Sequence, residues 1–121
     1  MKYALLIHDD EAAWARMSDE DRNQLFKEYS EFGNDLVARG LMRGGEQLQP
    51  TSTASTVRVR DGKTLTTDGP FAETKEQLGG FYLIECDNLD QAIDAAARIP
   101  STRVGGVIEV RPVVEYEEQP Q

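Results

Sequence analysis

The chain has 121 residues, the size of one domain, and is long enough to bury an ordinary core without a metal or a disulfide. Its 22 acidic and 13 basic side chains give a formal charge of −9, which makes nucleic acid and anionic membranes poor partners. No stretch approaches the roughly 20 apolar residues that span a bilayer. Residues 1–7 are too short for a signal peptide, and the single Cys86 suits a reducing compartment, so we expect a soluble cytoplasmic protein.

The first residues of the chain alternate in the manner of a strand. From Lys2 to His8, one face carries Tyr3, Leu5 and Ile7, and the other carries Ala4, Leu6 and His8. Both faces are largely apolar, so we expect both to be covered. Residues 9–17 are then expected to form a connector with one helical turn around Trp14.

A long helix is predicted over residues 19–39. Ser18 is a good N-cap, and acidic side chains fill the first turn, where they suit the helix dipole. Gly40 is suited to the left-handed conformation that ends a helix. Residues 41–49 follow as a weak strand that glycine interrupts. The helix is expected to bury an apolar stripe of Leu25, Tyr29, Phe32 and Leu36, with Phe26 and Val37 beside it.

Residues 57–67 carry the clearest hairpin signal in the chain. Two short strands, 57–60 and 63–67, flank Asp61-Gly62, a pair that tolerates the positive φ angles of a type I′ turn. The hairpin follows a Ser/Thr-rich loop and has little apolar surface of its own. We therefore expect it to project from the domain as a flap.

The last third of the chain predicts a strand, a helix and a final strand. Residues 79–86 show the strongest strand pattern, and Asn88 with Gln91 is a plausible capping pair for the helix that follows. Pro100 ends that helix, and the last strand covers residues 107–114. The helix is expected to bury a stripe of Leu89, Ala92, Ile93 and Ala96.

This order of elements predicts an α+β fold of ferredoxin-like split βαβ topology over residues 1–114, with an inserted hairpin and an acidic tail over 115–121. Its two helices can cover only one face of the antiparallel sheet. The other face stays apolar and open, and pairing with a second copy is the simplest way to cover it, so we expect a homodimer. The open face is expected to carry Ala4, Leu6, His8, Phe81, Leu83, Val107 and Val113.

The same alternation places polar side chains on the open face, namely His8, Glu85, Glu109 and Arg111. Buried charges need partners or a wet cavity, so a polar pocket between the sheet and its cover is predicted. A shift of one residue in the strand would turn the whole set outward. Glu109 and Arg111 are candidate binding residues, because a guanidinium suits the carboxylate of a small anionic ligand.

His8 and Asp68 are the candidate catalytic residues. His8 is the only histidine and suits acid–base chemistry near neutral pH; alternatively, it is a strand-end histidine that the next loop satisfies. Asp68 opens the tetrapeptide Asp68-Gly69-Pro70-Phe71, in which glycine and proline favour a rigid turn. The motif either only returns the hairpin to the central strand or also holds Asp68 at the mouth of the cavity.

Glu73, Lys75 and Glu76 follow this motif as further candidate binding residues. The plainer interpretation is a solvated surface cluster worth under about 1 kcal/mol per ion pair. If the segment folds inward, Lys75 joins Arg111 in holding an anionic substrate. One histidine and one cysteine are too few for a structural zinc site, and no loop has calcium spacing, so no metal or other cofactor is expected.

The segment from Asp68-Gly69-Pro70-Phe71 through Ala72-Glu73-Thr74-Lys75-Glu76-Gln77-Leu78-Gly79-Gly80-Phe81-Tyr82 closely resembles the core of the DGPF-type proteins of the YCII-related family. The first strand and Ile108–Pro112 resemble the ends of that family, so the resemblance covers nearly the whole chain. It implies a dimeric α/β barrel of ferredoxin-like subunits in bacterial, cytoplasmic proteins, mostly of unassigned function. Asp68, Glu73, Lys75 and Glu76 match the motif itself.

The resemblance also implies a choice of functions. Relatives in the wider superfamily include isomerases and dehalogenating enzymes for small ring compounds, and some members are encoded near sigma factors. A His-Asp pair is suggested as catalytic in other branches, where the histidine belongs to the region of the first helix; the first helix has no histidine here, and His8 lies nearby without clearly matching it. The chain is therefore expected to bind a small anionic or aromatic metabolite, to be an isomerase-, lyase- or dehalogenase-like enzyme using His8 or Asp68, or to be an accessory module of a sigma-factor-linked system.

Overall fold

A computed structural model of the protein describes residues 1–116, so most of the predicted acidic tail lies outside the described residues. The helices and strands confirm the predicted α+β class and nearly all of the predicted order. A short helix replaces the predicted single turn around Trp14. The elements are β1 (Lys2–Asp10), α1 (Glu11–Arg16), α2 (Asp19–Ala38), β2 (Met42–Gln47), the 3₁₀ helix η1 (Thr51–Thr53), β3 (Ser55–Arg60), β4 (Lys63–Asp68), β5 (Glu76–Glu85), α3 (Leu89–Ala97), the 3₁₀ helix η2 (Pro100–Val104) and β6 (Val107–Pro112).

The main sheet has four strands in the order β2-β5-β1-β6, and every neighbouring pair is antiparallel. The two βαβ units, one with α2 and the other with α3, therefore interleave as a ferredoxin-like fold requires. A bulge between Ile7 and His8 shifts the register of β1 against β5. Because of the bulge, Leu78 pairs with His8, and Gly79 is the extra residue on β5.

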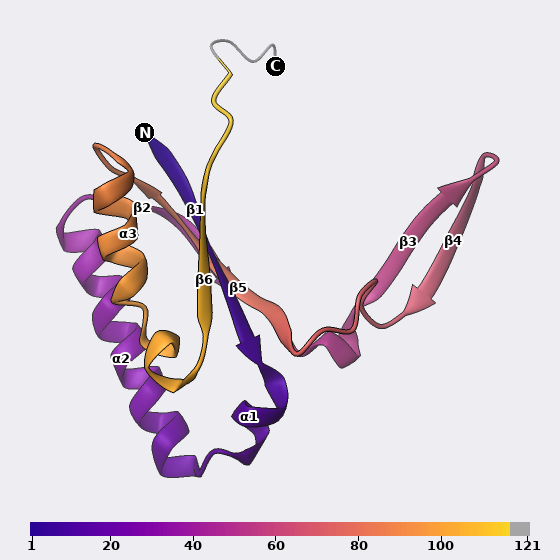
Figure 1. Ribbon diagram of the computed structural model, residues 1–121, viewed down its shortest axis with the longest axis horizontal. Helices are drawn as coiled ribbons and strands as arrows, with labels where there is room; N and C mark the ends of the chain where they lie inside the picture. Colours follow the sequence, from indigo (N-terminus) through magenta and orange to yellow (C-terminus); the bar gives the residue numbers. More distant parts are fainter. Residues whose placement is uncertain (117–121) are drawn as a thin grey trace.

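Helices α2 and α3 lie on one side of the four-stranded sheet (Figure 1). The hydrophobic core forms between these helices and the sheet. Leu5, Leu36 and Ile84 are fully buried there, with 0 % of their surface exposed. Helix α2 begins where the sequence predicts, since the Ser18 hydroxyl accepts a hydrogen bond from the backbone N–H of Asp21 at 3.1 Å. The helix ends at Ala38, and Gly40 two residues later takes a left-handed φ of 72°.

The predicted buried stripe of α3 is wrong at its two largest side chains. Leu89 and Ile93 are 48 % and 50 % exposed, whereas Ala92 and Ala95 are 0 % exposed and Ala96 is 5 % exposed. The helix turns its small residues toward the sheet, and alanine lets a helix approach closely. The larger pair, at positions i and i+4, lies on the flank of the helix instead.

Strands β3 and β4 form a separate two-stranded sheet, which we call the hairpin arm (residues 55–68). Asp61 and Gly62 have φ angles of 51° and 75°, as the predicted type I′ turn requires. The arm projects away from the sheet and the helices (Figure 1), which confirms the predicted flap. Within residues 1–116, no helix combines the length and the apolar character needed to cross a membrane.

Candidate functional site

The open face of the main sheet carries the polar residues that the strand alternation predicted. Residues directly opposite each other in an antiparallel pair point to the same side of the sheet. The face that the helices cover takes Tyr3, Leu5 and Ile7, all buried. The opposite face takes the remaining pairs of β1 and β6, which are Ala4 with Arg111, Leu6 with Glu109 and His8 with Val107.

Three of these side chains form a connected row, which we call the open-face row: His8, Glu109 and Arg111. Nε2 of His8 lies 3.6 Å from Oε1 of Glu109, which is an ion-pair distance and longer than a hydrogen bond. Nε of Arg111 donates to Oε2 of Glu109 at 3.2 Å, and Nη2 donates to the same oxygen. Within residues 1–116, Nη1 of Arg111 has no hydrogen-bond partner, so it is available to an acceptor outside the chain.

Glu109 is the electrostatic centre of the row. The hydrogen bonds from Arg111 lower the pKa of Glu109, and the charges of Arg111 and His8 lower it further. The carboxylate is therefore ionised at neutral pH and attracts the imidazole of His8. A histidine oriented by a carboxylate is the arrangement that acid–base catalysis uses.

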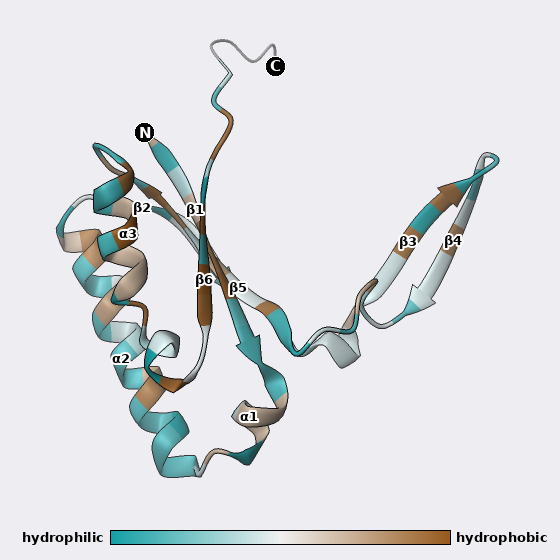
Figure 2. Ribbon diagram, in the orientation of Figure 1, coloured by the Kyte–Doolittle hydropathy of each residue, from teal (hydrophilic) through white to brown (hydrophobic). Residues whose placement is uncertain are grey.

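Apolar side chains surround the row. Strand β5 places Phe81 opposite Leu6 and Leu83 opposite Ala4, so both side chains lie on the open face. They are only partly buried, and Val107 next to His8 is 54 % exposed. Figure 2 shows apolar stretches of β5 and β6 in brown beside the polar end of β1. The open face is thus an apolar surface that carries the short polar row.

The structure does not bring the other candidate residues to this row. Asp68 ends β4, opposite Ser55 in the hairpin arm, and is exposed. Glu73 and Lys75 lie in the exposed loop between β4 and β5, and Glu76 begins β5 opposite Asp10. Among the described residues, no ion pair joins any of the four to the row. Their catalytic and binding roles stay predictions.

The loop that contains the distinctive tetrapeptide is an ordered turn. Gly69 has a φ of 95°, and its N–H donates to the carbonyl of Ala54 at 2.7 Å. Further on, Nε2 of Gln77 donates to the carbonyls of Ala72 and Thr74 at 3.2 Å and 2.8 Å. These bonds return the chain from the hairpin arm to β5, as the plainer interpretation of the motif predicts.

One long-range contact was not predicted from the sequence. Oε1 of Glu11 accepts from the backbone N–H of Thr51 at 2.9 Å, and Oε2 accepts from the Thr51 hydroxyl at 2.7 Å. The two residues are 40 positions apart. The contact ties the first turn of α1 to η1, just before the hairpin arm begins. No local pattern marks it, because a glutamate in a first turn and a threonine in a loop are each ordinary.

A second set of polar side chains, on the helix side of the sheet, was also not predicted from the sequence. Asp9 is half-buried there, and burial raises its pKa, against smaller opposing effects of the Ser101 hydroxyl and of His8. The Ser101 hydroxyl is itself buried and makes no hydrogen bond of normal geometry within the described residues. Burial likewise raises the pKa of the neighbouring Tyr29 and, to about 12, that of Tyr82. Strand β1 extends to Asp10, beyond the predicted end at His8, and its alternation places Asp9 on the helix-covered face with Ile7.

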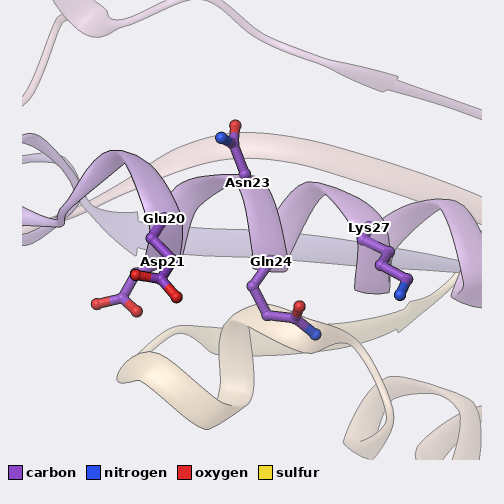
Figure 3. Close-up of a pocket in the computed structure, with 5 residues that line it drawn as sticks. All are labelled: Glu20, Asp21, Asn23, Gln24 and Lys27. Carbon is purple, nitrogen blue, oxygen red and sulfur yellow. The ribbon is translucent and has the colours of Figure 1, made fainter.

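Two shallow hollows lie on the helices. Figure 3 shows the first, on α2, lined by Glu20, Asp21, Asn23, Gln24 and Lys27. The second lies between α2 and η2, where Glu28 pairs with Arg103 and Asp35 pairs with Arg98. No predicted site residue lines either hollow, and in residues 1–116 no three His, Cys, Asp or Glu side chains converge to hold a metal ion.

Comparison with known proteins identifies a family and leaves the site without an assigned role. The family model described as the YCII-related domain matches residues 1–117. An uncharacterised protein of Rhizobium meliloti (strain 1021) is 42 % identical over 120 residues, which cover 96 % of this chain and 94 % of that protein. The match spans both strands that carry the open-face row. The chain therefore belongs to the YCII-related family.

Proposed function

We propose that the protein binds a small anionic or aromatic metabolite in a pocket between the open sheet faces of two copies. The observation that carries this proposal is the open-face row, His8–Glu109–Arg111, on an apolar face that the chain's own helices leave uncovered. A row of linked charges on an apolar surface is expected where a ligand must be both desolvated and oriented.

A second copy is the proposed cover for physical reasons. Leu6, Phe81 and Leu83 lie on one face of the sheet and stay partly exposed in a single chain. Contiguous apolar surface in water is unfavourable, and an identical chain is always present at the same concentration. Two facing sheets then enclose the row from both sides, and the resulting homodimer has two equivalent sites.

The class of ligand follows from the chemistry of the row. Arg111 already uses Nε and Nη2 on Glu109, so Nη1 is the group available to a carboxylate or phenolate oxygen. On the same face, Leu6 opposite Glu109 and Phe81 on the next strand offer apolar surface. Binding under a cover removes water from these groups, which strengthens the charged contacts.

An enzyme is the second candidate function, and the His8–Glu109 pair is the observation that favours it. His8 would transfer a proton to or from the ligand while Glu109 orients its ring. Asp68 fits this role less well, because it lies in the hairpin arm and not beside the row. The accessory role beside a sigma factor stays a prediction from the family resemblance.

A thermal-shift screen of the full chain against small carboxylates and phenols tests the proposal. A ligand at about 100 times its dissociation constant stabilises the folded state by about 2.7 kcal/mol, which a melting curve resolves readily. For a ligand so found, Arg111→Gln is expected to weaken binding at least about tenfold, because the charge-assisted contact is lost. Titration calorimetry measures the loss.

Arg16→Gln is the matched control, since Arg16 is exposed on α1 and makes no ion pair within the described residues. Equal affinity of both variants would contradict a site at the row. To separate binding from catalysis, His8→Ala and Asp68→Asn are compared by following the ligand with NMR. Turnover lost only in His8→Ala, with binding kept, supports the enzyme; unchanged turnover in both removes it.

A further inference from the structure

The hairpin arm is held out from the rest of the chain without cover. Every residue of β4 is exposed, and in β3 only Thr56 is partly buried. Its apolar side chains face water: Val57 is 59 % exposed, Val59 68 % and Leu65 46 %. A two-stranded hairpin with no packing partner is marginally stable in water. The arm therefore needs a surface to lie on, and Figure 1 shows that its own chain does not offer one.

The root of the arm is firmly fastened. The Gly69 N–H bonds to the carbonyl of Ala54, and the Thr56 hydroxyl donates to the carbonyl of Gly69 at 2.7 Å. Just before the arm, Glu11 holds Thr51 by two hydrogen bonds. The first two bonds close the base of the arm, and the Glu11 bonds tie the segment just before it to α1. A preorganised segment loses little conformational entropy when it binds a partner.

The charge of the arm is opposite to that of the rest of the molecule. Residues 55–68 contain three basic and two acidic side chains, a net charge of +1, so the remainder of the chain carries −10. Two of the basic side chains, Arg58 and Arg60, point to one face of the arm together with Leu65, which pairs with Arg58. The other face carries Val57 and Val59, each opposite a threonine.

We propose that the arm lies on the surface of a second copy of this chain, with its basic side chains against that copy's acidic surface. This inference rests on the proposed dimer and assigns the arm as its clasp, the element that holds the two copies together. Charge complementarity selects the occupant, because the body of the chain is strongly acidic and the arm is not. In a symmetric pair each copy gives one arm and receives one, so every contact is made twice. Phe71, 81 % exposed at the root of the arm, adds apolar surface to the contact.

Sedimentation of two charge-matched variants of the full chain tests the clasp. Arg58→Glu/Arg60→Glu reverses two charges on the arm, and Arg16→Glu/Lys27→Glu reverses two exposed charges on α1 and α2. Both change the net charge equally. The arm variant is expected to raise the dimer dissociation constant about tenfold or more, and the control variant much less. Added salt is expected to weaken the wild-type dimer and to reduce the difference in dissociation constant between the wild type and the arm variant.

A direct proximity measurement accompanies it. A spin label on Lys63→Cys is selective because Cys86 is buried, only 6 % exposed. In mixed dimers of a spin-labelled copy and an isotope-labelled copy, the clasp predicts broadened amide signals in the isotope-labelled copy. A dimer whose arms broaden nothing in the partner, or whose affinity the two variants reduce equally, overturns the clasp and leaves the dimer standing. A wild-type monomer overturns both.

Discussion

Neighbouring residues of β1 lie in opposite environments. Tyr3, Leu5 and Ile7 face the helices and are 2 %, 0 % and 5 % exposed, whereas Leu6 and His8 face the other way and remain partly exposed. The covered face is closed by α2 and α3 within one chain. The open face is nearly as apolar, yet it also carries the row of charges. One face of the strand thus builds the core, and the other is the face to which we assign binding, so mutations on the two faces are expected to act differently.

The largest expected difference between the faces comes from one matched pair of leucines. Leu5→Ala removes a fully buried side chain and is expected to lower the free energy of unfolding by about 2–5 kcal/mol. Leu6→Ala, one residue away, is expected to cost about 1 kcal/mol or less at protein concentrations where the chain is monomeric. Urea unfolding of both variants measures the difference.

Protein concentration sharpens this comparison. If a second copy covers the open face, the loss caused by Leu6→Ala grows as the dimer forms, because Leu6 is then buried too. The loss caused by Leu5→Ala stays the same at every concentration. A Leu6→Ala effect that is equally large in dilute samples would mean that the two faces do not differ.

Most of the fold was predictable because its signals are local. The Ser18 cap, the Asp61-Gly62 turn and the alternation of β1 each act within a few residues. The burial of α3 was not predictable in the same way. Leu89 and Ile93 are its largest apolar residues, yet the face of the helix that packs on the sheet is the one that carries its alanines. Which face of a helix meets the sheet is a tertiary property, and helical spacing alone does not contain it.

The site was predictable only in part, for a related reason. The alternation of β1 and β6 placed His8, Glu109 and Arg111 on one face, and strand pairing brings them together. Asp68 belongs to the hairpin arm, and no short-range rule says where a hairpin points. Asp9 faces inward because β1 continues to Asp10, two residues beyond its predicted end, and the contact of Glu11 with Thr51 depends on the packing of distant segments.

A smaller effect on stability is expected from alanine substitutions at two glycines, one at the end of the covered face and one inside α2. A Cβ on Gly106 would lie 2.7 Å from Oδ1 of Asp9 and 2.8 Å from the carbonyl oxygen of Ser101, so Gly106→Ala is expected to destabilise the fold by about 1–3 kcal/mol. Gly33, inside α2, has no atom within 4 Å of the same position. Gly33→Ala is expected to stabilise by about 0.5–1 kcal/mol, because alanine favours the helix. Thermal unfolding ranks the two, and a neutral Gly106→Ala would show that this end of the core is loose.

The smallest expected effect is the pH dependence caused by Asp9, the ionisable side chain at the edge of the covered face. Burial raises the pKa of Asp9 in the folded state above the ordinary 3.8, so its ionisation destabilises the fold. The contribution of Asp9 to stability is therefore complete below pH 3.8 and is lost as the pH rises through the folded-state pKa. Asp9→Asn removes this loss. The variant is expected to be more stable than the wild type at neutral pH, by about 1 kcal/mol or less because Asp9 is only half-buried, and the advantage is expected to shrink toward acid pH. Urea unfolding at pH 4 and pH 7 measures it; an Asp9→Asn protein that is less stable at pH 7 would mean that the ionised carboxylate holds the covered face together.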